Sequence, residues 1–140
     1  MNPFRVNKPV RFAHCDPAGI MFFPRYFELL NEVVEDWFAG PLDTPFADLH
    51  LRHGQGVPTV RCGAEFAHPS RLGDDLGFEL EVSEIGRSSC GLQVHARCGS
   101  ELRAGFLQVL VLVNLKTMKP VAWPQGLRTR IGAYRVESQA

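Results

Sequence analysis

The chain has 140 residues, and its 15 Lys and Arg residues are balanced by 15 Asp and Glu residues, so the formal net charge at pH 7 is zero. This length is enough to bury a core without disulfides or metals, and we expect a single domain over residues 1–140. The charge balance excludes the excess of Lys and Arg that nucleic-acid binding requires. The longest apolar run, Val109–Val113, is far shorter than the roughly 20 residues of a membrane-spanning helix, and the first residues lack an apolar signal core. We therefore expect a cytoplasmic protein that has neither nucleic acid nor membrane as a partner.

The first elements along the chain are a strand and a long helix. Val6–His14 is expected as a strand, and Pro24–Ala39 as an amphipathic helix, because its large apolar residues recur at helical spacing. Pro24 suits a first helical turn, where its missing N–H would be unpaired anyway, and Gly40-Pro41 is a stop signal. The broad apolar face of this helix predicts packing against a sheet.

The rest of the chain consists of short apolar segments separated by turn residues. Because consecutive strands without intervening helices pair in antiparallel fashion, the predicted class is α+β, with the helix on one face of an antiparallel sheet. One segment, Phe106–Val113, is apolar on both faces and argues against a monomer. The expected elements are strands Val57–Ala67, Leu76–Ile85, Cys90–Cys98 and Ala104–Leu115, followed by a short helix around Gln125–Ile131.

Residues 14–27, HCDPAGIMFFPRYF, combine two chemical features at the start of the long helix. Asp16-Pro17-Ala18-Gly19 is a tight-turn sequence that begins with a carboxylate. Just beyond it, unpaired backbone N–H groups around Phe22 and Phe23 form a natural oxyanion site. A carboxylate nucleophile or general base beside such amides suits hydrolysis of an activated acyl group. The alternative is a purely structural turn and helix cap, but the apolar run Ile20–Phe23 favours a contact with the core or the wall of a dry pocket.

The same segment, followed by the long helix and four strands, resembles the hotdog-fold acyl-CoA thioesterases of the 4-hydroxybenzoyl-CoA thioesterase type. The resemblance runs from about Arg5 to Val121, and its most specific part is Asp16–Ile20. It implies a curved antiparallel sheet of about five strands wrapped around one long central helix. It also implies subunits joined edge to edge, active sites at the dimer interface, and a homo-oligomer that is a dimer or a dimer of dimers (a homotetramer).

By this resemblance, the catalytic carboxylate is Asp16, acting as nucleophile or general base. The backbone N–H of Phe23 polarises the thioester oxygen, and Gly19 lets the chain approach the ligand. Some relatives carry a histidine where this chain has Phe23, so a histidine-assisted mechanism finds no side chain there. His14 is expected as a structural neighbour of the motif, placed on the first strand.

The resemblance also suggests residues that contact the substrate. Asn31 falls where the 4-hydroxybenzoyl enzymes carry an acid facing the acyl group, so a 4-hydroxybenzoyl substrate is in doubt; a solvated helix position remains the alternative. Phe22 and Thr59 are further candidates for the pocket lining. The acyl group itself is not predicted.

For the coenzyme part of the substrate, the turn Gly86–Ser89 corresponds to a basic turn that meets CoA phosphates. Arg87 would provide a charged contact and Ser88 and Ser89 hydrogen bonds, although an ordinary hairpin turn is the alternative. Because only one basic residue is present there, phosphate binding is expected to be either weaker or shared with one of three other arginines: Arg61, Arg71 or Arg103.

No cofactor is expected, because CoA is part of the substrate, and no metal site is expected either. His50, His53 and Cys62 lack an acidic partner at ligand spacing, and Cys15 is expected to be a packing thiol. The preferred function is acyl-CoA thioester hydrolysis. The alternatives are an acyl-thioester dehydratase or hydratase of the same fold, and a non-catalytic acyl-thioester-binding module.

Overall fold

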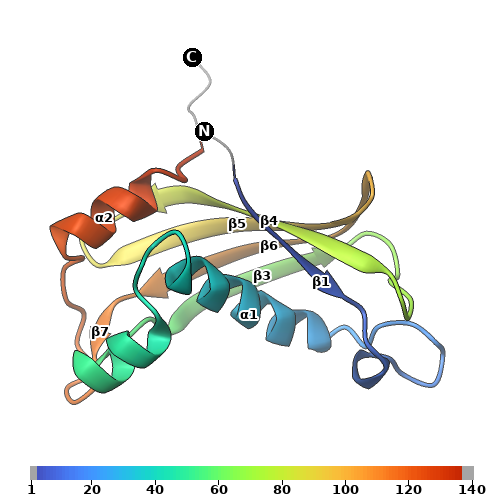
Figure 1. Cartoon of the computed structure of the whole chain (residues 1–140), viewed down its shortest axis with the longest axis horizontal. Coiled ribbons are helices and arrows are strands. Elements are labelled where there is room, and N and C mark those ends of the chain that lie inside the picture. The colour runs from blue at the N-terminus through green and yellow to red at the C-terminus, as the bar shows by residue number, and fades with distance from the viewer. Residues whose placement is uncertain (1–2, 137–140) are drawn as a thin grey trace.

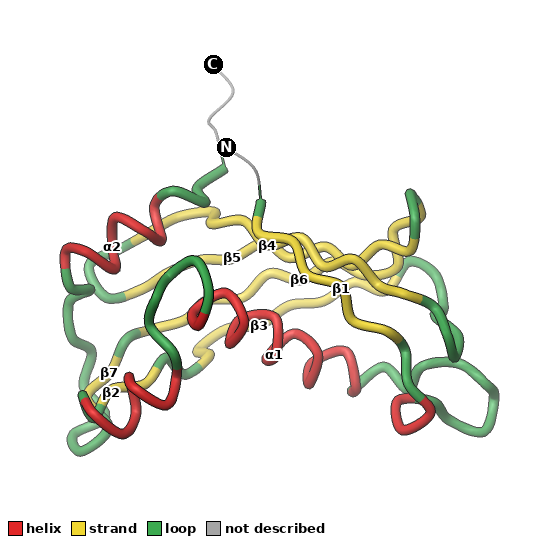
Figure 2. The backbone as a smooth tube through the Cα atoms, viewed as in Figure 1, coloured by secondary structure: helices red, strands yellow, loops and turns green. Residues whose placement is uncertain are grey.

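The computed structural model describes residues 3–136. A five-stranded antiparallel sheet has the strand order β1-β4-β5-β6-β3, and the long helix α1 runs along one of its faces (Figure 1). A small two-stranded sheet, β2-β7, lies beside the far end of α1 (Figure 2). In chain order, the elements are β1 (Phe4–Pro9), a 3₁₀ turn (Phe12–His14), α1 (Arg25–Ala39), a π-helical turn (Asp48–Arg52), β2 (Gln55–Gly56), β3 (Thr59–Phe66), β4 (Asp75–Ile85), β5 (Ser89–Cys98), β6 (Glu101–Val111), β7 (Val113–Asn114) and α2 (Gln125–Gly132).

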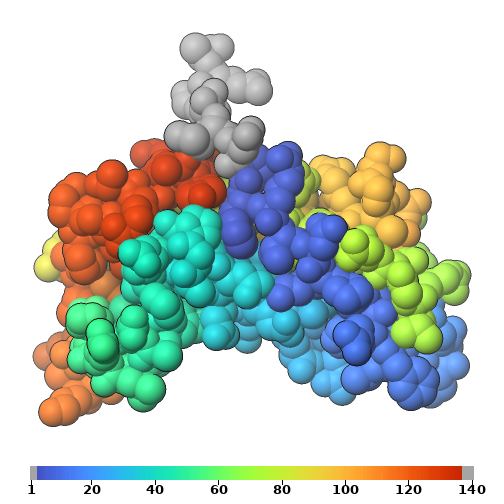
Figure 3. Space-filling view, in the orientation of Figure 1, coloured from blue at the N-terminus to red at the C-terminus, as the bar shows by residue number. Residues whose placement is uncertain are grey.

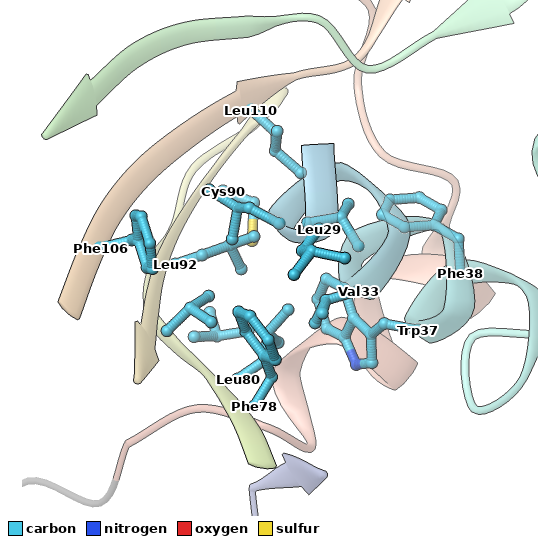
Figure 4. Packing of buried hydrophobic residues seen from close by; sticks show 14 of the residues in the cluster. Leu29, Val33, Trp37, Phe38, Phe78, Leu80, Cys90, Leu92, Phe106 and Leu110 are labelled. Atoms are coloured by element: carbon cyan, nitrogen blue, oxygen red, sulfur yellow. The ribbon is translucent and has the colours of Figure 1, made fainter. Parts of the chain in front are cut away.

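The predicted long helix is confirmed as α1, which begins after Pro24 and ends at Ala39. The Gly40 N–H closes it by donating to the Asp36 carbonyl at 2.9 Å. Its buried face packs onto one face of the sheet, where side chains from β4, β5 and β6 meet it (Figure 4). Burial of this face, rather than helix propensity, accounts for most of the stability of such a helix. The buried residues of α1 are Tyr26, Leu29, Leu30, Val33, Val34, Trp37 and Phe38.

The sheet has an inner face toward α1 and an outer face that no element of residues 3–136 covers. The predicted apolar segment Phe106–Val113 therefore divides between environments: Phe106 and Leu110 are buried on the inner face, whereas Leu107 on the outer face is 61% exposed. Strand β3 forms one edge of the sheet, and most of its residues are exposed. Within residues 3–136, the outer face and the free sides of the two edge strands, β1 and β3, are thus the unpartnered surfaces of the sheet.

Two sequence predictions need correction, and one element was not predicted. The first strand ends at Pro9, not at His14, and the chain then folds back into the 3₁₀ turn, with the Arg11 N–H donating to His14 Nδ1 at 2.9 Å. The expected strand Ala104–Leu115 is split, because the chain after Val111 turns to pair with β2. The π-helical turn Asp48–Arg52 was not predicted, since a single irregular turn leaves no periodic pattern.

Candidate active site

Residues 14–22 form a short hairpin, called here the Asp16 hairpin, at one end of the sheet. Its two arms are joined by a bridge between Cys15 and Met21, and the Phe22 N–H donates to the His14 carbonyl at 2.9 Å. The Asp16 N–H donates to the Ile20 carbonyl at 2.9 Å and closes the tip. In the space-filling view, this part of the chain (blue) projects at one corner of the molecule (Figure 3). The hairpin leads directly into α1.

The turn at the tip uses the Asp16 side chain and still leaves one carboxylate oxygen free. Asp16 Oδ1 accepts the Ala18 N–H at 2.9 Å, and the Asp16 carbonyl accepts the Gly19 N–H at 3.0 Å. Gly19 has φ +81°, a left-handed conformation that glycine adopts without strain. Within residues 3–136, Asp16 Oδ2 has no hydrogen-bond partner. The structural turn expected from the sequence therefore coexists with a carboxylate oxygen open to a ligand.

At the start of α1, one amide differs from the prediction. The sequence suggests unpaired N–H groups around both Phe22 and Phe23, but the Phe22 N–H is paired with His14. The Phe23 N–H has no acceptor in the part of the chain that the structure describes. Since Pro24 carries no N–H, Phe23 provides the last free donor before the helix. One amide rather than two is left for an oxyanion.

A polar network fixes the Asp16 hairpin to the segment between β3 and β4. The Met21 N–H donates to the Ser70 carbonyl at 2.8 Å, and the Tyr26 and Ser70 hydroxyls are 2.7 Å apart. Arg103 Nη1 donates to Ser70 Oγ at 3.1 Å and to Asp74 Oδ2 at 2.7 Å. The hydrogen bond that Arg103 donates to Asp74 keeps the pKa of the Asp74 carboxyl below its usual value.

Arg103, one of the three arginines expected from the sequence to share CoA phosphate contacts, is paired with two carboxylates of its own chain. Its guanidinium is enclosed by Asp74 and by Glu101, whose Oε1 is 2.7 Å from Arg103 Nε. The sequence did not predict this network, because Tyr26 was assigned only to the apolar face of α1. Its position on that apolar face could have indicated such a network, because a buried tyrosine hydroxyl requires a hydrogen-bond partner.

The predicted site residues fall into two groups at opposite ends of β3. Phe66 ends β3, and its ring centroid lies 5.8 Å from that of Phe23, whereas Thr59 begins β3, roughly 23 Å away for seven extended residues. Thr59 Oγ1 accepts a hydrogen bond from Gln108 Nε2 at 2.7 Å. Asp16, Gly19, Phe22 and Phe23 thus lie at the Phe66 end.

The turn Gly86–Ser89 lies at the Thr59 end, because Cys90 and Thr59 both pair with Leu110. The Gly86 N–H donates to the Ser89 carbonyl at 2.9 Å, and the Arg87 side chain is exposed. Asn31 is exposed on α1, one turn after Phe27. A single chain therefore does not bring Arg87, Ser88, Ser89 or Thr59 together with Asp16.

Two further features of residues 3–136 bear on other functions. No group of three or more His, Cys, Asp or Glu side chains converges there as a metal site. In the same residues, no helix is long and apolar enough to cross a membrane. The cytoplasmic location stays a prediction.

Comparisons with known proteins agree with the fold and with the predicted enzyme class. The chain is 28% identical over 137 residues to 1,4-dihydroxy-2-naphthoyl-CoA hydrolase from Prochlorococcus marinus (strain MIT 9303), covering 91% of this chain and 90% of that protein. It is 32% identical over 85 residues to 4-hydroxybenzoyl-CoA thioesterase from Pseudomonas sp. (strain CBS-3), covering 60% of each.

The structure is similar to that of Slr0204, a 1,4-dihydroxy-2-naphthoyl-CoA thioesterase from Synechocystis, with a TM-score of 0.84 at 21% identity, over 91% of this chain and 94% of that one. This likeness confirms the predicted hotdog fold, and the relatives named as CoA hydrolases and thioesterases bear out the predicted enzyme class. A family model described as the Thioesterase-like superfamily matches residues 10–131. The chain belongs to the Thioesterase-like superfamily.

Proposed function

We propose that this protein hydrolyses an acyl-CoA thioester to the free acid and CoA, with Asp16 as the catalytic carboxylate and the Phe23 N–H as the oxyanion donor. The observation that carries the proposal is the pairing pattern of the Asp16 hairpin. Most of its backbone N–H groups are paired, whereas one carboxylate oxygen of Asp16 and the Phe23 N–H, on the same short segment, have no partner within residues 3–136. Unpaired polar groups of this kind are typical of ligand sites.

The proposed reaction has two possible first steps. In one, the Asp16 carboxylate attacks the thioester carbonyl carbon, the C–S bond breaks, and CoA leaves as a thiolate that takes a proton; water then hydrolyses the acyl-aspartate anhydride. In the other, Asp16 takes a proton from a water molecule that attacks the same carbon. In both, negative charge develops on the carbonyl oxygen, and the Phe23 N–H stabilises it.

The alternative of a dehydratase or hydratase receives little support from α1. That chemistry needs a histidine or an acid on the inward face of the central helix. Within α1, the buried residues are one tyrosine, one tryptophan, one phenylalanine, two leucines and two valines. The inward face therefore offers no general base of that kind.

We also propose that the active site is completed by a second copy of the chain, paired through β3. Two identical edge strands that pair in antiparallel fashion about a two-fold axis bring the Thr59 end of one copy to the Phe66 end of the other. The Asp16 hairpin of one subunit then lies near the Gly86–Ser89 turn of its partner. Arg87, Ser88 and Ser89 are proposed to hold the CoA phosphates there, with Thr59 and Asn31 close to the acyl chain.

The charges of β3 favour one pairing position. Arg61, Gly63 and Glu65 share the outer face, because they lie opposite Val109, Leu107 and Gly105 of β6. Pairing centred on Gly63 places Arg61 of each copy opposite Glu65 of the other, so the dimer gains two complementary cross-strand pairs. Centring on either neighbouring residue leaves both charges without such partners.

The function is tested by measuring thiol release from a panel of aromatic and aliphatic acyl-CoAs with a chromogenic disulfide. Relatives are named for hydroxylated aromatic acyl groups, so these substrates come first. Asp16→Asn should lower kcat by roughly 10²-fold or more. Retention of a near-normal rate would disprove the role of Asp16. CoA binding without thiol release from any substrate would favour the non-catalytic module.

Subunit complementation tests the shared site. An Asp16→Asn chain and an Arg87→Glu chain each form defective homodimers, but a mixed dimer has one site with both native residues. Co-expression with two affinity tags isolates the mixed dimer. Recovery of up to half of the wild-type activity is expected if the site combines two subunits, and no recovery is expected if both residues serve a site within one chain.

A further inference from the structure

The turn Gly86–Ser89 is held on one side by the later segment Leu112–Arg128. Each of the four backbone carbonyls of the turn accepts a hydrogen bond from a group of that segment. The donors are the Arg128 guanidinium to Gly86, the Trp123 N–H to Arg87 at 2.9 Å, the Leu112 N–H to Ser88 at 2.8 Å and Trp123 Nε1 to Ser89 at 2.9 Å. All the carbonyls of the turn are therefore committed to the protein interior.

The N–H groups of the same turn are directed the other way. In a trans peptide, the N–H of each residue points opposite to the carbonyl of the residue before it, and the peptide bonds of this turn are trans. The Arg87 N–H therefore points away from Arg128, and the Ser88 N–H points away from Trp123. Neither N–H has an acceptor within residues 3–136. Successive unpaired N–H groups in a turn are typical of a backbone nest, which binds anions.

Arg128 brings a second positive charge to the turn, which itself carries only Arg87. Arg128 belongs to α2, beside the ends of β4 and β5 (Figure 1), and reaches the Gly86 carbonyl through Nη1. Within residues 3–136 it forms no ion pair with a carboxylate, unlike Arg103. Because Arg128 and Gly86 are 42 positions apart, the sequence does not place this charge at the turn.

Trp123 fixes the shape of the turn through two hydrogen bonds. Its side chain is 5% exposed and belongs to the hydrophobic core, so the indole is held in place by packing. The backbone N–H and Nε1 of Trp123 reach the carbonyls of Arg87 and Ser89, two residues apart, and thus restrain both ends of the peptides between them. A site that is already ordered pays less conformational entropy when a ligand binds.

Resting on the proposed function, we propose that Trp123 and Arg128 are positioning residues for CoA. They hold the turn Gly86–Ser89 so that the N–H groups of Arg87 and Ser88 form a nest for a CoA phosphate, and Arg128 adds its charge behind that nest. Their contribution is to binding of the phosphate and is independent of the acyl group. Loss of either residue should therefore raise KM and leave kcat unchanged.

The first test uses two substrates with the same acyl group, the best acyl-CoA of the panel and the N-acetylcysteamine thioester, which has no phosphate. Trp123→Phe removes the indole N–H and should raise KM for the acyl-CoA about 3-fold or more, while kcat/KM for the short thioester changes less than about 2-fold. Trp37→Phe is the matched control, because Trp37 is also buried but its Nε1 has no hydrogen-bond partner within residues 3–136. An unchanged KM, or equal losses on both substrates, would overturn the inference.

A second variant removes the charge from a half-buried position. Arg128→Met should raise KM for the acyl-CoA about 5-fold or more and make KM depend less steeply on salt, with little effect on the short thioester. Arg130→Met is the control, because Arg130 lies on the same helix but donates to the Leu42 carbonyl at 2.7 Å. A salt dependence equal to that of the wild type would contradict the role of Arg128.

Titration calorimetry with CoA separates this inference from the proposed function. If the wild type binds CoA but cleaves no acyl-CoA, the proposed function fails. The inference is then decided by Trp123→Phe, for which CoA affinity about 3-fold weaker supports it and unchanged affinity overturns it. A wild type with equal KM for the acyl-CoA and the short thioester overturns the inference but not the proposed function. A wild type that neither binds CoA nor cleaves acyl-CoA overturns both.

Discussion

The proposed catalytic role of the Phe23 N–H can be tested separately from its contribution to stability. Because this N–H has no acceptor within residues 3–136, replacing it by an ester oxygen removes a donor without breaking a hydrogen bond that it makes. Incorporation of phenyllactic acid at position 23 achieves this change and keeps the phenyl ring. The ring contacts with Phe22 and Phe66, both at 5.8 Å between centroids, are retained.

The ester at position 23 should reduce transition-state stabilisation several times more than it reduces the free energy of unfolding. Loss of one oxyanion donor should lower kcat by roughly 10²–10³, or about 2.7–4 kcal/mol of transition-state stabilisation. The ester also weakens the Phe22 carbonyl as an acceptor for the Arg25 N–H, now at 2.9 Å. That change should lower the free energy of unfolding by no more than about 1 kcal/mol. Thiol release gives the first quantity, and urea unfolding gives the second.

An ester at position 22 is the matched control. It removes the Phe22 N–H, which donates to the His14 carbonyl at 2.9 Å, and leaves the Phe23 N–H in place. It should therefore cost stability, about 1 kcal/mol, but much less of kcat than the ester at position 23. If the ester at position 23 keeps kcat within 3-fold of the wild type, or if both esters lower kcat equally, the Phe23 amide is not the oxyanion donor.

Three further predictions concern the turn, the polar network and the edge strand. Gly19→Ala should lower the free energy of unfolding by about 1–2 kcal/mol in urea titrations, because φ is +81° and no neighbouring atom is close enough to clash. Asp74→Asn should destabilise the protein at pH 7 but progressively less at lower pH. The hydrogen bond from Arg103 lowers the pKa of Asp74 below its ordinary value of 3.8. The ionised carboxylate therefore stabilises the fold fully above that ordinary value, and this stabilisation is lost as the pH falls through the folded-state pKa. Arg61→Glu should weaken the proposed dimer in sedimentation experiments, and the double change Arg61→Glu with Glu65→Arg should restore it.

The sequence predicts the parts of the fold that follow a regular period. The bounds of helix α1 are predicted to within one residue, because its apolar positions repeat at helical spacing between Pro24 and Gly40. The first strand is overextended by five residues, because Val10 and Phe12 continue an apolar pattern after the strand has ended at Pro9. Patterns of this kind indicate burial but do not distinguish an extended segment from a turn.

The sequence predicts which residues form the candidate site, but not the hydrogen bonds that join them to distant parts of the chain. Asp16 and Phe23 follow from turn and helix-start chemistry, which is local in sequence. The hydrogen bond between the Tyr26 and Ser70 hydroxyls joins residues 44 positions apart. The hydrogen bond from Arg103 Nη1 to Asp74 Oδ2 joins residues 29 positions apart. Such long-range contacts depend on strand order and register, which a single sequence does not reveal.

The same lack of register information affects the site as a whole, because its two halves lie at opposite ends of β3. In the proposed dimer, moving the centre of pairing by one residue shifts the partner strand by two residues, or roughly 7 Å. Such a shift keeps every side chain on its proper face, so burial alone does not prevent it. It would change the distance between the Asp16 hairpin and the partner's Gly86–Ser89 turn by about the length of a side chain. If the proposed pairing holds, Arg61 and Glu65 therefore act on activity by fixing the distance between the proposed catalytic carboxylate and the proposed phosphate contacts.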